Sequence, residues 1–121
     1  MSGPHDLGIK GEEIAVQHLK DSGYKIIERN WKAGKLEIDI IASKGKFIVF
    51  AEVKTRSADF VVPPAMAVNR DKQRSIIMAA DIYIKRYNID QEGRFDIITI
   101  VSNGDDYSVE HIEDAFYPTL R

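Results

Sequence analysis

The chain contains no cysteine among its 121 residues, and this absence excludes several kinds of site. Without thiols there is no disulfide framework, no thiolate zinc or iron–sulfur centre and no cysteine nucleophile. No apolar run approaches the roughly 20 residues that cross a bilayer, and the first residues lack the apolar core of a signal peptide. We therefore expect a cytoplasmic protein with no membrane partner.

Common active-site motifs and linkers are missing as well. The sequence has no serine-hydrolase G-x-S-x-G, no P-loop and no dinucleotide-binding G-x-G-x-x-G pattern. Its three histidines, His5, His18 and His111, do not have the spacing of metal ligands, so we expect ordinary structural roles for them. No repeat, low-complexity tract or Gly/Ser-rich linker divides the chain, and residues 1–121 are predicted to form a single domain.

The charges nearly cancel over the whole chain but are unevenly distributed. There are 17 Lys and Arg against 19 Asp and Glu, a formal net charge of −2. Residues 20–57 hold nine basic and five acidic side chains, residues 69–86 hold five and two, and residues 87–121 hold two and eight. Two basic segments and an acidic last third are compatible with a basic face that attracts an anionic polymer, although a solvated surface looks the same in sequence.

Hydrophobic periodicity predicts two helices and five strands. Ala15, Val16 and Leu19 fall on one stripe of the first helix, which Gly23 ends, and Asn69 is predicted to cap the second. The expected elements are a helix over 8–22, strands over 24–31, 36–41 and 47–55, a helix over 69–87, and strands over 95–101 and 107–112. Since helices and strands interleave while the middle strands form a hairpin, the sequence predicts an α/β fold, a mixed central sheet flanked by helices in the order αβββαββ.

Four charged residues interrupt the apolar pattern: Glu12, Asp39, Glu52 and Lys54. Burying a carboxylate without compensation costs several kcal/mol, so each acid must be neutralised, paired with a cation or placed in a wet cleft. Taken singly, each has an ordinary explanation: the Glu-x-Lys pair as an ion pair on a wet strand, the Asp as a turn former, and the helical Glu as a first-turn carboxylate favoured by the helix dipole. Their coincidence favours a joint site.

The expected hairpin register brings the strand residues of this set together. A turn of two or four residues pairs Ala42 with Phe47. In that register Asp39 is the diagonal neighbour of Glu52, about 7 Å away at the backbone, and Lys54 lies on the same face. A three-residue turn would reverse this relation.

Such a cluster suits a particular chemistry. Two carboxylates, a main-chain carbonyl such as that of Val53, and waters give the oxygen-rich, partly open coordination that Mg²⁺ or Mn²⁺ prefers. An ammonium group beside the ion, here that of Lys54, can stabilise the negative charge of a phosphoryl group in the transition state. Trp31 next to Lys32 could stack a base beside a phosphate contact, although a lone Trp at a strand end usually packs in the core.

Several short motifs span nearly the whole chain: Gly8–Ala15, Gly23-Tyr24, Arg29-Asn30, Glu37–Ala42, Val49–Arg56, Lys72 and Arg94–Asp96. Together they resemble the YraN-like family of small bacterial proteins. That family is similar in turn to the PD-(D/E)xK, or restriction-endonuclease-like, superfamily, which includes archaeal-type Holliday junction resolvases. One position differs, because Leu36 stands where the family pattern has Gly before the Glu-Ile-Asp motif.

The resemblance implies a restriction-endonuclease-like core and a divalent-metal-dependent nuclease, with DNA favoured over RNA as the substrate and branched or junction DNA as a candidate. By the same resemblance Asp39 and Glu52 would hold Mg²⁺ or Mn²⁺, and Glu12 would complete the acidic cluster. Lys54 would be the catalytic lysine. The residues expected to bind nucleic acid are Lys32, Arg56, Lys72 and Arg74.

Two other classes of function stay open. The chain could be a nucleic-acid-binding module that keeps the fold without catalysis, or a structural or partner-binding protein. Carboxylates close to phosphates repel them, so a retained acidic cluster favours a nuclease over a pure binder. A chain of this size covers only a few base pairs, and a homodimer on duplex or branched DNA is attractive by symmetry.

Overall fold

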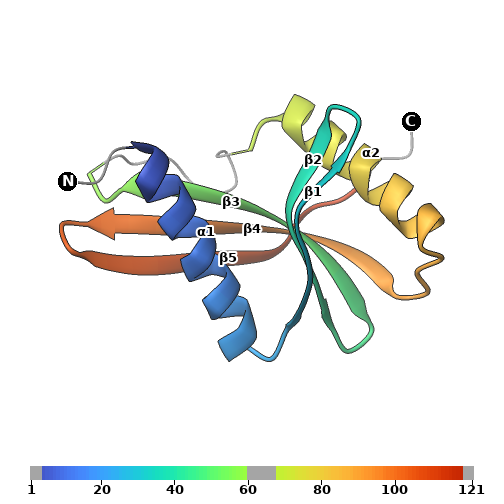
Figure 1. Ribbon diagram of the computed structural model, residues 1–121, viewed down its shortest axis with the longest axis horizontal. Coiled ribbons are helices and arrows are strands. Elements are labelled where there is room, and N and C mark those ends of the chain that lie inside the picture. Colours follow the sequence, from blue (N-terminus) through green and yellow to red (C-terminus); the bar gives the residue numbers. More distant parts are fainter. Residues whose placement is uncertain (1–3, 60–67, 119–121) are drawn as a thin grey trace.

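Residues 4–59 and 68–118 are described by the computed structural model, and they form two helices and five strands (Figure 1). The order confirms the predicted succession of one helix, three strands, a second helix and two strands. Neither of these two helices has the length and hydropathy that a membrane span requires. The elements are α1 (Pro4–Asp21), β1 (Lys25–Ala33), β2 (Leu36–Lys44), β3 (Phe47–Ser57), α2 (Arg70–Arg86), β4 (Glu92–Asn103) and β5 (Asp106–Phe116).

The strands form one mixed sheet in the order β1-β2-β3-β4-β5. β3 and β4 run parallel, from the pair Phe47–Glu92 to the pair Ser57–Ser102, and all other neighbouring strands are antiparallel. Parallel neighbours need a long crossover connection, and α2 lies in that connection. The predicted mixed sheet flanked by helices is confirmed.

Each face of the sheet is covered by one helix (Figure 1). On one face Ala15, Val16 and Leu19 of α1 pack in a cluster with Val49 of β3 and Ile98 of β4. Because both faces of β3 and β4 are buried, these two strands read as almost continuous apolar runs. The buried cluster on the α2 face comprises Trp31, Ile38, Ile41, Ile48, Phe50, Val68, Ile76, Ala79, Ala80, Tyr83, Phe95, Ile97 and Phe116.

A glycine sets how closely α1 approaches the sheet. Gly11 is buried, and a Cβ atom added to it would overlap Oγ1 of Thr55 on β3. A side chain at this position would push the helix away from the strand. Since Glu12 is the next residue, the close approach at Gly11 also decides where Glu12 lies.

Element boundaries differ from the prediction mainly at two ends. α1 begins at Pro4 instead of residue 8, and the fixed φ of proline suits the first turn of a helix. β5 continues to Phe116 instead of ending at 112, because a bulge at Asp114, with φ of 53°, lets the strand run on beside β4. The predicted cap of α2 is confirmed, since the Asn69 side chain accepts a hydrogen bond of 2.9 Å from the main-chain N–H of Lys72.

The register of the β2–β3 hairpin is not the predicted one. Lys44 pairs with Phe47 and Ala42 pairs with Val49, so the expected pairing of Ala42 with Phe47 is wrong by two residues. The two turn residues are Gly45-Lys46, and Gly45 takes a positive φ of 57° at the first turn position, as tight hairpins require. A shift of two residues leaves every side chain of the ladder on its predicted face.

The side-chain alternation of β2 breaks at Asp39. Ile38 packs in the cluster under α2, whereas Ile40, two residues later, packs in the cluster under α1. The β2–β3 ladder also ends here, with Ile40 paired to Ala51 as its last pair. The sequence prediction assumed strict period-two alternation, which therefore does not assign Asp39 to a face of the sheet. Asp39 lies at the point where β2 and β3 separate.

Candidate functional site

Asp39 and Glu52 meet where the β2–β3 ladder ends. The main-chain N–H of Val53 donates a hydrogen bond of 2.9 Å to Oδ2 of Asp39. This contact takes the place of the next ladder hydrogen bond, and it fixes the Asp39 carboxylate against β3 beside Glu52. The structure thus brings together the two predicted metal-binding acids, although through a strand irregularity and not through the predicted diagonal pairing.

Glu52 is a buried carboxylate that is only partly compensated. The residue is 4% exposed, and its Oε1 lies 3.8 Å from Nζ of Lys54 and 3.8 Å from Nζ of Lys72. At these distances the contacts are ion pairs and are too long to be hydrogen bonds. Within the described residues, Oε2 of Glu52 has no hydrogen-bond partner at all. A buried carboxylate oxygen without a donor is unfavourable, so this position calls for a proton or a cation.

The pKa values of both carboxyl groups are raised, and that of Glu52 strongly. Burial raises the pKa of Glu52 to about 7, the neighbouring charge of Asp39 adds to this rise, and Lys72 and Lys54 oppose it. Burial also raises the pKa of Asp39, against the hydrogen bond from Val53, and the charges of Glu12 and Glu37 contribute in the same direction. In the absence of metal, Glu52 therefore keeps its proton up to about pH 7.

The donor set fits a hard divalent cation. Mg²⁺ and Mn²⁺ are commonly held by one or two carboxylates and several waters, and Asp39 and Glu52 supply two carboxylates. In residues 10–59 and 68–118, whose side chains the structure describes, no set of three or more His, Asp or Glu side chains is arranged to hold a metal ion. The candidate site consists of two carboxylates, Asp39 and Glu52, and it does not resemble a zinc centre with three or four protein ligands.

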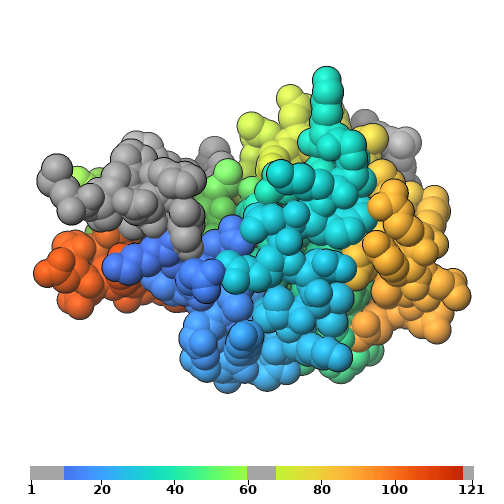
Figure 2. All heavy atoms as spheres, in the orientation of Figure 1, coloured from blue at the N-terminus to red at the C-terminus, as the bar shows by residue number. Residues whose placement is uncertain are grey.

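Glu12 reaches the neighbourhood of this pair from α1. Its Oε1 accepts a hydrogen bond of 2.8 Å from Nδ2 of Asn30 and one of 3.3 Å from Nη2 of Arg29, both on β1. The Glu12 side chain is 20% exposed. Figure 2 shows that the surface of α1 continues into that of β1 and β2. Sequence reasoning identified Glu12 but missed the two β1 residues that hold it.

The structure brings one of the four predicted nucleic-acid-binding residues to the carboxylates. Lys72 extends from the first turn of α2 to Glu52, and the sequence could not indicate this because it does not show where the helix begins relative to the sheet. Arg74 is 72% exposed and pairs with Asp71 of its own helix at 3.5 Å.

The other two predicted binding residues lie on strands. Arg56 on β3 pairs with Glu110 of β5 at 3.2 Å, and Lys32 is exposed on β1 in register with Glu37. Trp31 is 8% exposed and packs edge-to-face on Tyr83, with ring centroids 5.2 Å apart. Core packing, not base stacking, therefore explains Trp31.

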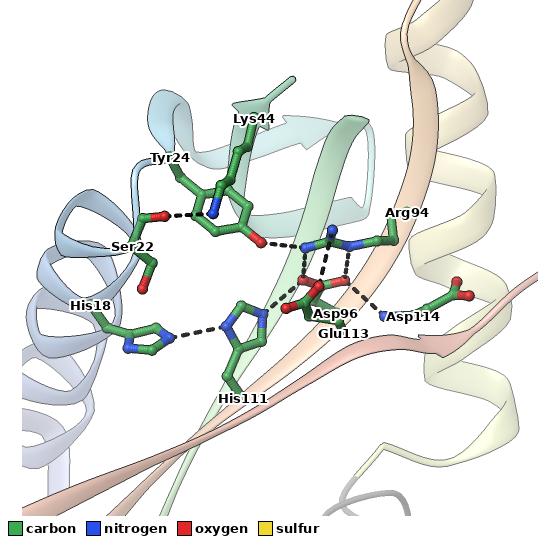
Figure 3. A network of polar contacts seen from close by, with 9 residues as sticks. All are labelled: His18, Ser22, Tyr24, Lys44, Arg94, Asp96, His111, Glu113 and Asp114. Carbon is green, nitrogen blue, oxygen red and sulfur yellow. Dashed lines mark hydrogen bonds and ion pairs between the residues drawn. The ribbon is translucent and has the colours of Figure 1, made fainter. Parts of the chain in front are cut away.

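A second polar cluster, which sequence reasoning missed, lies between α1, β4 and β5 (Figure 3). Asp96 is fully buried and accepts hydrogen bonds from Arg94 Nε at 2.9 Å, Arg94 Nη2 at 2.7 Å and the main-chain N–H of Asp114 at 3.1 Å, while Nε2 of His111 lies 2.7 Å from it. Burial alone raises the pKa of Asp96, but the hydrogen bonds from His111, Arg94 and Asp114 outweigh burial and hold this pKa below its ordinary value.

The same cluster pairs two of the histidines. Nδ1 of His111 lies 3.0 Å from Nε2 of His18, although the residues are 93 positions apart in the sequence, and burial and His111 together lower the pKa of His18. Nη2 of Arg94 donates a 2.5 Å hydrogen bond to the Tyr24 hydroxyl. Every oxygen of Asp96 is satisfied, so this cluster suits a structural tie between elements. Its sequence signal is the Arg-x-Asp pair within an apolar strand.

Comparison with known proteins finds a family model and several relatives that match this chain. A family model described as "Uncharacterised protein family UPF0102" matches residues 11–100, a range that contains the candidate site. A UPF0102 protein of Geobacter metallireducens is 47% identical over 111 residues, covering 91% of each chain. One of Bacteroides fragilis is 46% identical with 94% of each chain covered, and one of Bacteroides thetaiotaomicron is 42% identical with 99% of each covered.

Proposed function

The chain belongs to the uncharacterised protein family UPF0102, the YraN-like family that its motifs resemble, and we propose that this member is a divalent-metal-dependent nuclease that hydrolyses phosphodiester bonds in DNA. One observation carries the proposal above all. The half-buried carboxylate of Asp39 lies beside the buried carboxylate of Glu52, one oxygen of Glu52 has no hydrogen-bond donor among the described residues, and two lysines flank it.

The proposed cofactor is Mg²⁺ or Mn²⁺, held by Asp39 and Glu52. When bound, such an ion polarises a phosphoryl group and makes water a better nucleophile. The two carboxylates supply the negative charge that draws the ion into the site, where it would displace the proton that the pair retains. Glu12, held next to them, adds a third negative charge nearby.

Lys54 and Lys72 are the groups proposed to act on the substrate. Both ammonium groups lie 3.8 Å from Glu52 and both side chains are about two-fifths exposed, so each can reach a phosphate without losing its contact with the site. Donors placed where negative charge develops stabilise the transition state of phosphoryl transfer. Lys54 comes from β3 and Lys72 from α2, so the phosphate would be contacted from two elements.

The choice of DNA over RNA, and of branched or junction DNA, rests on the resemblance to restriction-endonuclease-like enzymes. Two copies related by a twofold axis would match the two strands of a duplex, so a homodimer is part of the proposal. The two basic segments of the sequence, residues 20–57 and 69–86, support binding to an anionic polymer in spite of the net charge of −2.

The proposal is tested by incubating the protein with labelled duplex, single-stranded, flapped and four-way-junction DNA and with RNA, in Mn²⁺, Mg²⁺ or EDTA. We expect cleavage that requires metal and falls about 100-fold or more in Asp39→Asn and Lys54→Ala. Matched controls are Asp81→Asn and Lys85→Ala, which alter an exposed ion pair of 2.9 Å on α2 and should cleave like the wild type.

Two results would count against a nuclease. Cleavage that persists unchanged in both Asp39→Asn and Lys54→Ala would show that the activity does not come from this site. Absence of cleavage, with binding that survives EDTA and weakens linearly in log affinity against log salt, would favour a non-catalytic nucleic-acid-binding module.

A further inference from the structure

The residue that holds Glu12 has an unusual backbone. Asn30 lies inside β1 with a φ of 52°, in the left-handed region that residues other than glycine rarely adopt. Asparagine is among the residues that tolerate this conformation best, at a cost on the order of 1 kcal/mol. Strain of this kind inside a strand persists only where the surrounding contacts impose it.

The position of Asn30 in the sheet connects it with the candidate site. Asn30 stands between the pairs Arg29–Ile40 and Trp31–Ile38, so its counterpart on β2 is Asp39. Asn30, where β1 is irregular, and Asp39, where β2 is irregular, thus lie opposite each other in the sheet. The turned backbone of Asn30 lets its side chain reach α1, where Nδ2 donates its 2.8 Å hydrogen bond to Glu12.

Arg29 and Asn30 divide their contacts between two glutamates. Nη2 of Arg29 lies 2.6 Å from Oε1 of Glu13 and 3.3 Å from Oε1 of Glu12, so its positive charge is directed mainly to Glu13. The shorter contact of Glu12 comes from the neutral amide of Asn30. An amide donor fixes the direction of a carboxylate without cancelling its charge, and the longer contact with Arg29 offsets the charge of Glu12 only in part.

We infer that Asn30 is a positioning residue whose side-chain amide holds the Glu12 carboxylate beside the Asp39–Glu52 pair. Without this bond Glu12 would keep only the 3.3 Å contact with Arg29, and the negative charge of Asp39 would repel the Glu12 carboxylate from the site. The inference rests on the proposed function, since the purpose of the bond is to strengthen the attraction of the site for a divalent cation.

The test compares Asn30→Gly with Glu12→Gln in a double-mutant cycle of Mn²⁺ affinity, measured by titration calorimetry. Glycine keeps the positive φ and removes only the amide. Each single variant is expected to weaken Mn²⁺ binding about tenfold, the scale of outer-shell contacts, and the double variant to bind no more weakly than Glu12→Gln alone. Asn88→Gly, at another asparagine with φ of 52°, is the matched control and should bind Mn²⁺ like the wild type.

A metal-free readout tests the contact itself. The side-chain amide protons of Asn30 should have hydrogen-bonded NMR shifts in the wild type and in Glu13→Gln, and should lose them in Glu12→Gln. Wild-type Mn²⁺ affinity in Asn30→Gly, additive losses in the cycle, or amide shifts unaffected by Glu12→Gln would each overturn the inference. If the wild type binds no Mn²⁺ while the amide contact is present, the proposed cation site fails, and with it the role of the contact.

Discussion

Glu52 shows most clearly how a single residue ties stability to function in this protein. Its carboxylate is buried between two lysines that are too distant for hydrogen bonds, next to a second acid and with one oxygen unpartnered among the described residues. A proton satisfies this arrangement, and so would a cation. Without either, the ionised pair opposes folding, because two desolvated like charges lie together.

The pH dependence of stability follows from the raised pKa of Glu52. Because the folded pKa is about 7 and the ordinary value is 4.5, the contribution of Glu52 is fully present below about pH 4.5 and is lost as pH rises through 7. In EDTA, Glu52→Gln should therefore be more stable than the wild type at pH 8. The expected difference in the free energy of unfolding is about 1.4 kcal/mol for each pH unit by which the pKa of Glu52 is higher in the folded than in the unfolded protein.

Denaturant unfolding at a series of pH values measures this difference. The exposed Glu13 provides the control, since Glu13→Gln should leave the pH profile of the wild type unchanged. Parallel profiles for the wild type and Glu52→Gln would mean that Glu52 is ionised at no cost in the folded protein, contrary to the unfavourable burial of its charge.

At the scale of residues, the sequence predicts the acids better than their partners. Glu12, Asp39 and Glu52 stand out because a charged residue in an apolar stretch is costly and therefore conspicuous. Asn30 and Lys72 do not interrupt an apolar pattern, and the sequence pointed to them only through the motifs of the family resemblance. The role of Asn30 depends on a positive φ and a contact with α1, and that of Lys72 depends on where α2 begins relative to β3.

At the scale of elements, the close packing of α1 on β3 helps to position the candidate site. Gly11→Ala adds a Cβ that meets Oγ1 of Thr55, and overpacking of this kind costs about 1–3 kcal/mol. We expect lower stability in urea unfolding and weaker Mn²⁺ binding, because the displaced helix carries Glu12 with it.

Gly93→Ala is the matched control for this substitution. Its added Cβ would lie 3.6 Å from Ile84 and 3.7 Å from Phe50, which are ordinary contact distances, so stability should change little. Equal stability of Gly11→Ala and the wild type would show that α1 does not need the close approach to β3.

The regular parts of the elements were predictable and the irregular parts were not. Helix and strand order follow from hydrophobic period, and the N-cap of α2 follows from Asn69. The irregularities at Asn30, Asp39 and Asp114 arise from contacts between strands and helices that are distant in sequence. Two of the three lie at the candidate site, where local rules often fail.

At the scale of the whole molecule, two polar clusters differ in how completely they are satisfied. The cluster around Asp96 is saturated with donors and joins α1 to β4 and β5 (Figure 3). The cluster around Glu52 has an unpartnered oxygen and a raised pKa. A buried polar network whose hydrogen bonds are all satisfied stabilises a fold. An unsatisfied network where several elements meet gains the most binding energy from a ligand that satisfies it.

Whether Mn²⁺ replaces the proton of the Asp39–Glu52 pair can be measured directly. Calorimetric titration in two buffers of different ionisation enthalpy, at a pH about one unit below the Glu52 pKa of about 7, measures both affinity and proton release. We predict that the wild type binds Mn²⁺ and releases protons, that this release diminishes at alkaline pH, and that Glu52→Gln loses both binding and release. Mn²⁺ binding that Glu52→Gln retains unchanged, or no binding by the wild type, would contradict a cation site at this pair.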